Sequence, residues 1–192
     1  MIHGMVFLLV ACAAGSAWAH EGGAAAGFAS GFLHPLTGAD HVMAMIAVGL
    51  WGAQLRAPAM WMLPVAFPLM MALGGLLGLL AMPLPGVEIA IAASALVLGG
   101  LVSMEARLPL AAALLIVAAF AIFHGHAHGA ELAPGTSAAA YSLGFVIATG
   151  MLHAVGILIG LAHLLPGGGL AVRGAGVVVG CAGLFFLARI FL

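Results

Sequence analysis

Long apolar segments separated by short breaks make up most of the chain. We predict membrane-spanning helices at residues 34–55, 59–82, 87–106, 109–130, 138–164 and 170–191. Each is close to the roughly 20 apolar residues that a helix needs to cross a bilayer. Proline, glycine and arginine mark the breaks, as in Leu165-Pro-Gly-Gly-Gly169. Because the breaks are short, we expect successive helices to run antiparallel, in an all-α membrane bundle of about six transmembrane helices.

A shorter apolar run, Met5 to Ala14, precedes these segments and is too short to cross a bilayer comfortably. It is followed by Ala17-Trp18-Ala19, which has the small-x-small form of a signal-peptide cleavage site. We therefore expect residues 1–19 to be a cleaved signal peptide and residues 20–192 to form a single six-helix transmembrane domain. The alternatives are an uncleaved first helix and a lipoprotein cleavage site, which Leu9-Val-Ala-Cys12 resembles.

The arginines give an independent prediction of orientation. A cleaved signal peptide puts the mature N-terminus on the periplasmic side of a bacterial inner membrane, and helix alternation then puts Arg56, Arg107 and Arg173 on the cytoplasmic side. These three obey the positive-inside rule, whereas Arg189, near the outer end of the last segment, does not. Both arguments predict a multi-pass protein of the inner membrane.

The composition excludes several classes of protein. Of 192 residues, 66% are hydrophobic and 5% are charged, whereas soluble domains have about a quarter of charged residues. The surface of the protein must therefore contact the lipid bilayer, which is its expected partner. The net charge of −1 gives no reason to expect a nucleic-acid partner. The sequence has neither a Gly-Lys-Ser/Thr phosphate loop nor a His-Glu-x-x-His motif, so we expect no ATP use, no metalloprotease and no enzymatic activity.

Nine histidines stand out in this apolar chain, and the first group opens the first predicted span. The segment His34-Pro-Leu-Thr-Gly-Ala-Asp40-His41 places an acidic residue inside a span. An ionised carboxylate there costs about 2.5–3.5 kcal/mol on insertion scales, and persists where it pairs, lines water or binds a cation. A hydrogen bond to a neighbouring group is the structural alternative. Seven residues of straight helix rise about 10 Å, which is too far for His34 and His41 to bind one ion. Either the segment unwinds near Gly38 and the two share an ion, or they form two successive binding sites.

The second group closes the fourth predicted span, in Phe123-His-Gly-His-Ala-His-Gly-Ala-Glu131. At about 100° per residue, His124, His128 and Glu131 share one helix face, and histidines four residues apart can bind one metal ion. His126 points elsewhere. A solvated loop with incidental histidines is the alternative.

Antiparallel packing brings both groups to the periplasmic end, together with His20 beside the predicted mature N-terminus. Imidazole and carboxylate ligands without thiolate suit Ni²⁺, Co²⁺, Zn²⁺ or Cu²⁺ better than Cu⁺ or Mg²⁺. His153, inside the fifth span, is a further candidate ligand on an exit route. We expect His163 to make ordinary hydrogen bonds. Glu88 lies at the end of a span, where we expect it at the membrane interface.

The segments His34 to Trp51 and Phe123 to Glu131 resemble the signatures of the HupE/UreJ family of hydrogenase and urease accessory membrane proteins. They match its His-x5-Asp-His and Phe-His-Gly-x-Ala-His-Gly-x-Glu patterns without departure. The resemblance implies nickel permeation, with cobalt in some members, that indirectly serves nickel-enzyme maturation proteins. It also implies six functional positions, which are His34, Asp40, His41, His124, His128 and Glu131.

We therefore expect a facilitator that moves Ni²⁺, with Co²⁺ or Zn²⁺ as alternatives, across the inner membrane and holds no organic cofactor. Two rival interpretations remain open at this stage. One is a haem-binding membrane cytochrome with histidines from facing helices, and the other is a metal-binding accessory or sensor protein that does not transport its ion.

Overall fold

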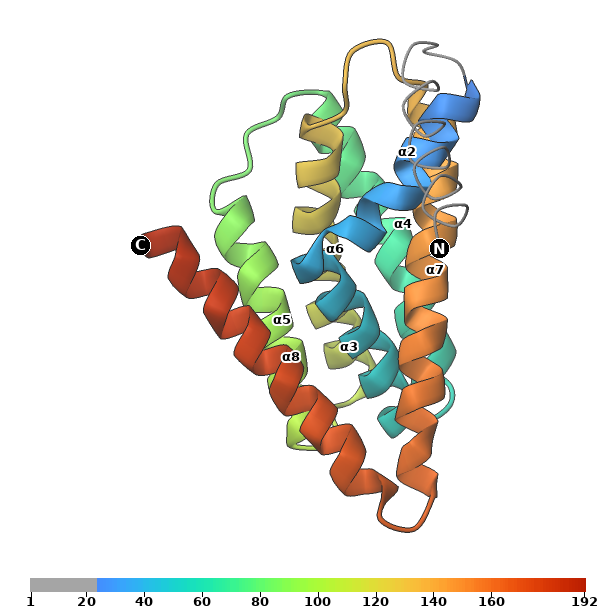
Figure 1. Cartoon of the computed structure of the whole chain (residues 1–192), viewed down its shortest axis with the longest axis vertical. Coiled ribbons are helices and arrows are strands. Elements are labelled where there is room, and N and C mark those ends of the chain that lie inside the picture. Colours follow the sequence, from blue (N-terminus) through green and yellow to red (C-terminus); the bar gives the residue numbers. More distant parts are fainter. Residues whose placement is uncertain (1–23) are drawn as a thin grey trace, which may run out of the picture.

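Helices are the regular elements of this protein, and no strand occurs between residues 24 and 192. The computed structural model describes residues 24–192, so the predicted signal peptide and His20 lie outside the described residues. Figure 1 shows the arrangement of the elements. In chain order they are α2 (Ala24–Thr37), α3 (Ala39–Leu55), α4 (Ala59–Leu79), α5 (Val87–Ser103), α6 (Leu110–Ala130), α7 (Ala138–Gly160), the 3-10 helix η1 (Leu161–Leu164) and α8 (Gly168–Phe191). The expected all-α membrane fold is confirmed.

The first predicted span is broken. α2 and α3 meet at Gly38 and are bent by 79° relative to each other. Gly38 has an extended backbone, with φ −82° and ψ 106°, and its carbonyl accepts the N–H of Val42. Glycine loses more freedom than other residues on entering a helix, which favours a break here. The predicted span over residues 34–55 is therefore two helices, of which the first begins at Ala24 and not at residue 34, and the alternative of unwinding near Gly38 is confirmed.

The lengths of the helices support a multi-pass membrane protein. α4, α6, α8 and the continuous α7–η1 segment are each long and apolar enough to cross a bilayer. The bent pair α2–α3 adds a fifth crossing if it is counted as one broken span. α5 is apolar but shorter, with 17 residues. It ends at Ser103, whereas we predicted that it would end at residue 106. All six predicted segments are thus helical and occur in the expected order.

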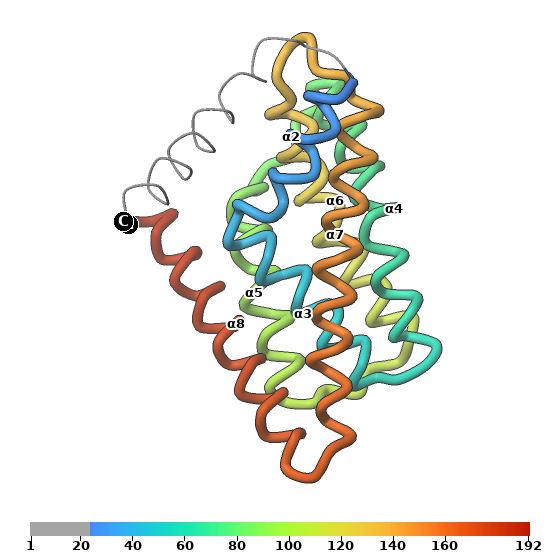
Figure 2. Tube along the Cα trace, turned by 45° about the vertical axis from the view of Figure 1, so that its right-hand side comes forward, coloured from blue at the N-terminus to red at the C-terminus, as the bar shows by residue number. Residues whose placement is uncertain are grey.

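Neighbouring helices approach each other closely where glycine removes the side chain. α4 packs on α6, α5 on α8, and α7 on both α2 and α3, as Figure 2 shows for α7. A methyl group added at Gly125 of α6 would collide with the Met71 carbonyl of α4, and one at Gly49 of α3 with the His153 carbonyl of α7. In lipid, small residues stabilise helix pairs through such close van der Waals packing.

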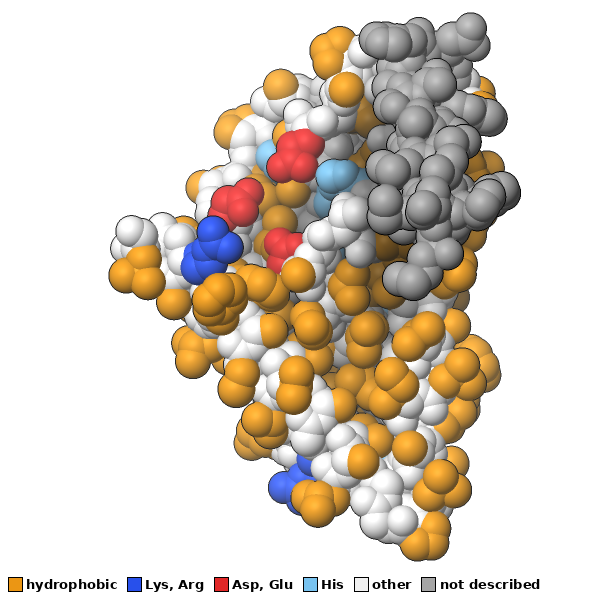
Figure 3. Space-filling model, viewed as in Figure 1, with side chains coloured by type: hydrophobic (Ala, Val, Ile, Leu, Met, Phe, Trp, Pro, Cys, Tyr) orange, Lys and Arg blue, Asp and Glu red, His pale blue; other side chains and the backbone are white. Residues whose placement is uncertain are grey.

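α3 forms the centre of the bundle, and every residue from Ala47 to Ala53 is buried. The indole N–H of Trp51 in this stretch donates to the Ala106 carbonyl at 2.9 Å, which ties the end of α3 to the loop after α5. Most of the outer surface is apolar, as Figure 3 shows for the lower half of one face. Large side chains such as Leu115 and Leu158 are about 70% exposed, as expected for a surface that contacts acyl chains.

Candidate metal centre

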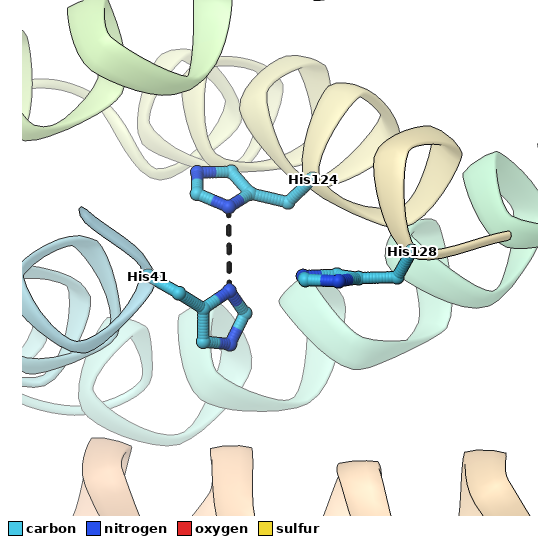
Figure 4. Close-up of side chains that lie close together, drawn as sticks. All are labelled: His41, His124 and His128. Atoms are coloured by element: carbon cyan, nitrogen blue, oxygen red, sulfur yellow. Dashed lines mark hydrogen bonds between the residues drawn. The ribbon is translucent and has the colours of Figure 1, made fainter. Parts of the chain in front are cut away.

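Two helices bring three histidines to one point inside the bundle. His41 lies in the first turn of α3, and His124 and His128 lie one turn apart near the end of α6. One ring nitrogen from each lies within 4.8 Å of the other two. Figure 4 shows the three rings converging from the two helices. We call these residues the histidine triad. Its spacing suits a single ion bound by three imidazoles.

Hydrogen bonds orient the His124 ring so that one nitrogen is free to bind an ion. The Ser94 hydroxyl on α5 donates to the Ile91 carbonyl at 2.7 Å, so its oxygen must accept from His124 Nε2, at 2.9 Å. His124 Nε2 therefore carries the proton, and Nδ1 has an available lone pair. That Nδ1 faces His41, and the His124 side chain is 1% exposed. An outer partner that fixes the tautomer in this way is typical of metal-binding histidines.

His41 has a polar partner at each ring nitrogen. Its Nδ1 lies 3.3 Å from Nδ1 of His124, and its Nε2 lies 3.4 Å from the Thr149 hydroxyl of α7. Without an ion, His41 Nδ1–H donates to the lone pair of His124, and Nε2 accepts from Thr149. For His41 Nδ1 to act as a ligand, the ring proton would have to lie on Nε2, where the Thr149 hydroxyl can accept its hydrogen bond.

His128 connects the triad to a second group nearer the surface. His128 Nδ1 is buried without a hydrogen-bond partner within the described chain. His34, His128 and Glu131 also offer ligand atoms within 4.8 Å of one another, and we call them the outer group. The His128 ring touches both neighbours, with ring centroids 4.8 Å from His34 and 5.2 Å from His41. One imidazole is therefore shared between a half-exposed group and a buried one.

A small cavity joins these groups to the surface. It has a volume of about 220 Å³, and its lining includes the whole outer group, His41 of the triad, and the acidic residues Asp40 and Glu88. Asp40 and Glu88 also line an adjoining hollow of about 250 Å³ beside Arg189. Figure 3 shows acidic and histidine side chains close together on this face. Clustered carboxylates raise the local concentration of cations at such an opening.

Phe145 of α7 forms an apolar wall beside the triad. Its ring centroid lies 5.1 Å from that of His41 and 4.5 Å from that of His128, and the side chain is 4% exposed. This wall limits the water that can reach the imidazoles from the α7 side. An ion that enters the triad must therefore exchange water for nitrogen ligands.

The structure separates the remaining predicted ligands from the triad. Asp40 belongs to neither group, because its Oδ1 accepts the backbone N–H of His41 at 2.8 Å while the side chain lines the cavity. His126 Nε2 lies 2.7 Å from the Met82 carbonyl, to which it donates. His153 lies apart from both groups, on α7. Metal binding by any of these residues stays a prediction.

Three residues of the site were not identified from the sequence. Ser94 and Thr149 are fully buried hydroxyls, and Glu88, which we assigned to the interface, faces the cavity. A serine and a threonine inside apolar spans were the available signal. Their partners depend on the rotation of α5 and α7 about their axes, which the sequence alone does not give.

Comparison with known proteins identifies the family of the chain. The family model described as HupE / UreJ protein matches residues 8–186 of the chain. A relative named Protein HupE, from Rhizobium leguminosarum bv. viciae, is 43% identical over 175 residues, which cover 85% of this chain and 91% of the relative. No solved structure matches the chain. Because the family match includes every helix that contributes to the histidine triad, the chain belongs to the HupE / UreJ family.

Proposed function

We propose that this protein is a facilitator that carries Ni²⁺, or the chemically similar Co²⁺, across the bacterial inner membrane. The observation that carries this proposal is the buried histidine triad, in which hydrogen bonds leave ring nitrogens available for an ion. Buried imidazoles without a carboxylate among them favour borderline transition metals over Mg²⁺ or Ca²⁺. Transport of an ion needs no bond-making chemistry, so the proposal includes no enzymatic step.

The two groups provide a stepwise route inward. The acidic cavity attracts the hydrated ion, and the outer group of His34, His128 and Glu131 replaces part of its water. Because His128 also belongs to the triad, the ion passes to His41 and His124 without losing every ligand at once. Several incomplete sites in succession favour conduction, since one closed and saturated site would trap the ion.

The membrane potential is sufficient to drive uptake. One charge that moves inward across about 100 mV, inside negative, gains about 2.3 kcal/mol. A divalent ion gains about twice as much, which corresponds to a roughly thousandfold accumulation at equilibrium. We propose that the cavity faces the periplasm, and that nickel-enzyme maturation proteins capture the ion inside. Arg56, Arg107 and Arg173 then lie on the cytoplasmic side, as the positive-inside rule favours.

The geometry of the triad argues against the haem alternative. Two axial histidines must bind opposite faces of a flat macrocycle. The facing nitrogens of His41 and His124 are only 3.3 Å apart, and their ring planes are inclined by 68°. A porphyrin has no room between rings in contact, whereas a single ion needs only small adjustments of the side chains.

Uptake of radioactive Ni²⁺ by cells that lack other nickel importers tests the proposal. We expect uptake with the wild type and loss of uptake with His124→Ala and His128→Ala. His163→Ala is the matched control and should keep wild-type uptake, because its Nδ1 donates to the Gly160 carbonyl of its own helical turn, far along α7 from the triad. Absence of uptake by correctly inserted wild-type protein would rule out transport, and unchanged uptake in both triad variants would rule out this site.

A further inference from the structure

His153 is a buried imidazole that neither metal group includes. It lies on α7, is 1% exposed, and has Nδ1 at 2.9 Å from the Met45 carbonyl of α3. A carbonyl only accepts hydrogen bonds, so Nδ1 carries the proton and Nε2 has the lone pair. That Nε2 is fully buried and has no hydrogen-bond partner within the described chain.

An unpaired polar nitrogen in an apolar interior destabilises a fold unless something offsets the loss of water. The arrangement of His153 matches that of a metal-binding histidine, in which one nitrogen donates to a carbonyl and the other is presented to the ion. The hydrogen bond to Met45 fixes both the tautomer and the ring, so the lone pair stays available.

The position of His153 continues the route from the triad. Met45 follows His41 by one turn of α3, which corresponds to about 6 Å along the helix axis. The Phe67 ring of α4 bridges the two levels, with its centroid 5.7 Å from the His124 ring and 5.5 Å from the His153 ring. Phe67 is fully buried, so this aromatic ring is the contact that links His124 of the triad to His153.

We propose that Nε2 of His153 is a second, inner station for the divalent cation, reached from the triad past Phe67. This inference rests on the proposed function and adds a site one turn deeper than the triad. One imidazole holds an ion more weakly than three, and a weak station after a stronger one favours release toward the far side. The negative face of the Phe67 ring stabilises a cation as it passes between the two stations.

A purely structural role is the competing explanation, because the hydrogen bond to Met45 joins α3 to α7. Two substitutions separate the roles. His153→Asn keeps an N–H donor near the position of Nδ1 but removes the Nε2 ligand. His153→Gln loses that donor but puts an amide oxygen, a weak ligand, near the position of Nε2. A structural role therefore requires the Asn variant to function, whereas a ligand role favours the Gln variant.

The test combines Ni²⁺ uptake in cells with Co²⁺ binding to purified protein, followed by visible absorption. Substitution of mere outer partners of a metal site costs about 10–100-fold in affinity or activity, so loss of a ligand should reduce uptake by at least about tenfold. We expect His153→Asn to bind Co²⁺ at the triad as the wild type does but to lose uptake to this extent. His153→Gln should retain more uptake than His153→Asn.

Wild-type uptake by His153→Asn would overturn the inner station while leaving the proposed function intact. Loss of Co²⁺ binding by His153→Asn would also overturn it, since a deeper station is not needed to fill the triad. Uptake that is unaffected by His124→Ala would instead overturn the proposed function, whatever the His153 variants do.

Discussion

Individual hydroxyl groups decide what the buried imidazoles can do. The Ser94 hydroxyl oxygen accepts a hydrogen bond from His124 Nε2–H, and the Thr149 hydroxyl lies 3.4 Å from His41 Nε2. Neither hydroxyl reaches the triad's ligand nitrogens, yet both influence which nitrogen of each ring has its lone pair free. We therefore expect the affinity of the triad for a metal ion to depend on side chains that do not touch the ion.

Replacement of Ser94 by alanine should weaken metal binding without loss of fold. The substitution removes the acceptor of the His124 Nε2 proton, so the ring no longer favours the tautomer with Nδ1 free. We expect Co²⁺ affinity, measured by absorption titration, to fall by about 10–100-fold. Ser103→Ala is the matched control on the same helix, because its hydroxyl donates only to the Gly100 carbonyl. Equal affinity in both variants would contradict the assigned role of Ser94.

The charge and the hydrogen bond of Asp40 should be separable by substitution. Asp40→Asn keeps an oxygen acceptor for the His41 N–H, whereas Asp40→Ala removes it and should cost about 0.5–1.5 kcal/mol, the net contribution of a typical hydrogen bond. Both variants lose the negative charge that lines the cavity. We therefore expect a lower melting temperature only for the alanine variant, and slower Ni²⁺ uptake for both.

The effect of Asp40 on uptake should depend on salt, because attraction by exposed charges is screened at high ionic strength. A rate deficit of the asparagine variant that persists unchanged in high salt would show that Asp40 acts by direct coordination instead of attraction.

The packing of whole helices determines the triad, because its histidines come from α3 and α6 and converge only if these two helices keep their relative position. Glycines position α6 against α4. One of them, Gly125, directly follows His124 in the sequence and precedes His128. The bend at Gly38 is the second requirement, since it lets α2 return His34 to the level of His128. The site is thus built from the contacts between helices as much as from its ligands.

A methyl group at Gly125 should disturb both stability and binding. Gly125→Ala would push against the Met71 carbonyl, and overpacking of this kind costs about 1–3 kcal/mol. We expect a lower melting temperature in detergent and weaker Co²⁺ binding. Gly150→Ala of α7 is the control, because no atom lies within 4 Å of the added carbon, and it should keep or slightly raise stability. Similar behaviour of the two variants would refute the role of close packing.

At the scale of the whole molecule, charge is distributed unevenly between the two ends of the bundle. Asp40, Glu88 and Glu131 line the cavity that leads to the triad. Arg56 and Arg107, with one carboxylate, Glu105, line a separate cavity of about 420 Å³ at the end of α3 that lies away from the triad, whereas Arg189 lies beside Asp40 and Glu88. If the acidic cavity faces the periplasm, as proposed above, this distribution suits inward movement of a cation toward the end of the bundle that holds Arg56 and Arg107.

Purified protein in liposomes should accumulate Ni²⁺ in response to a membrane potential alone. A potassium diffusion potential of about 100 mV, inside negative, should raise the equilibrium ratio of free ion toward roughly thousandfold. A metal-sensitive dye trapped inside the liposomes measures this ratio. Accumulation that ignores the potential, or that needs ATP, would contradict a passive facilitator.

The sequence was sufficient for the features that depend on local composition. Runs of apolar residues predicted the six helical segments, and Gly38 marked the point where the first of them breaks. Features that depend on how helices face each other were not predictable. The bond between Ser94 and His124 requires the rotation of α5 relative to α6, and no periodic pattern encodes it. The early end of α5 follows from the positive φ of 50° at Glu105, a residue type that rarely adopts it.

The most direct test of the central claim is X-ray absorption at the nickel edge of Ni²⁺-loaded protein in detergent. The account predicts imidazole nitrogens at about 2.0–2.1 Å, with the scattering pattern of about three rings in the wild type and one fewer in His124→Ala. A shell of water oxygens alone, unchanged by the His124→Ala substitution, would contradict binding of the ion by the histidine triad.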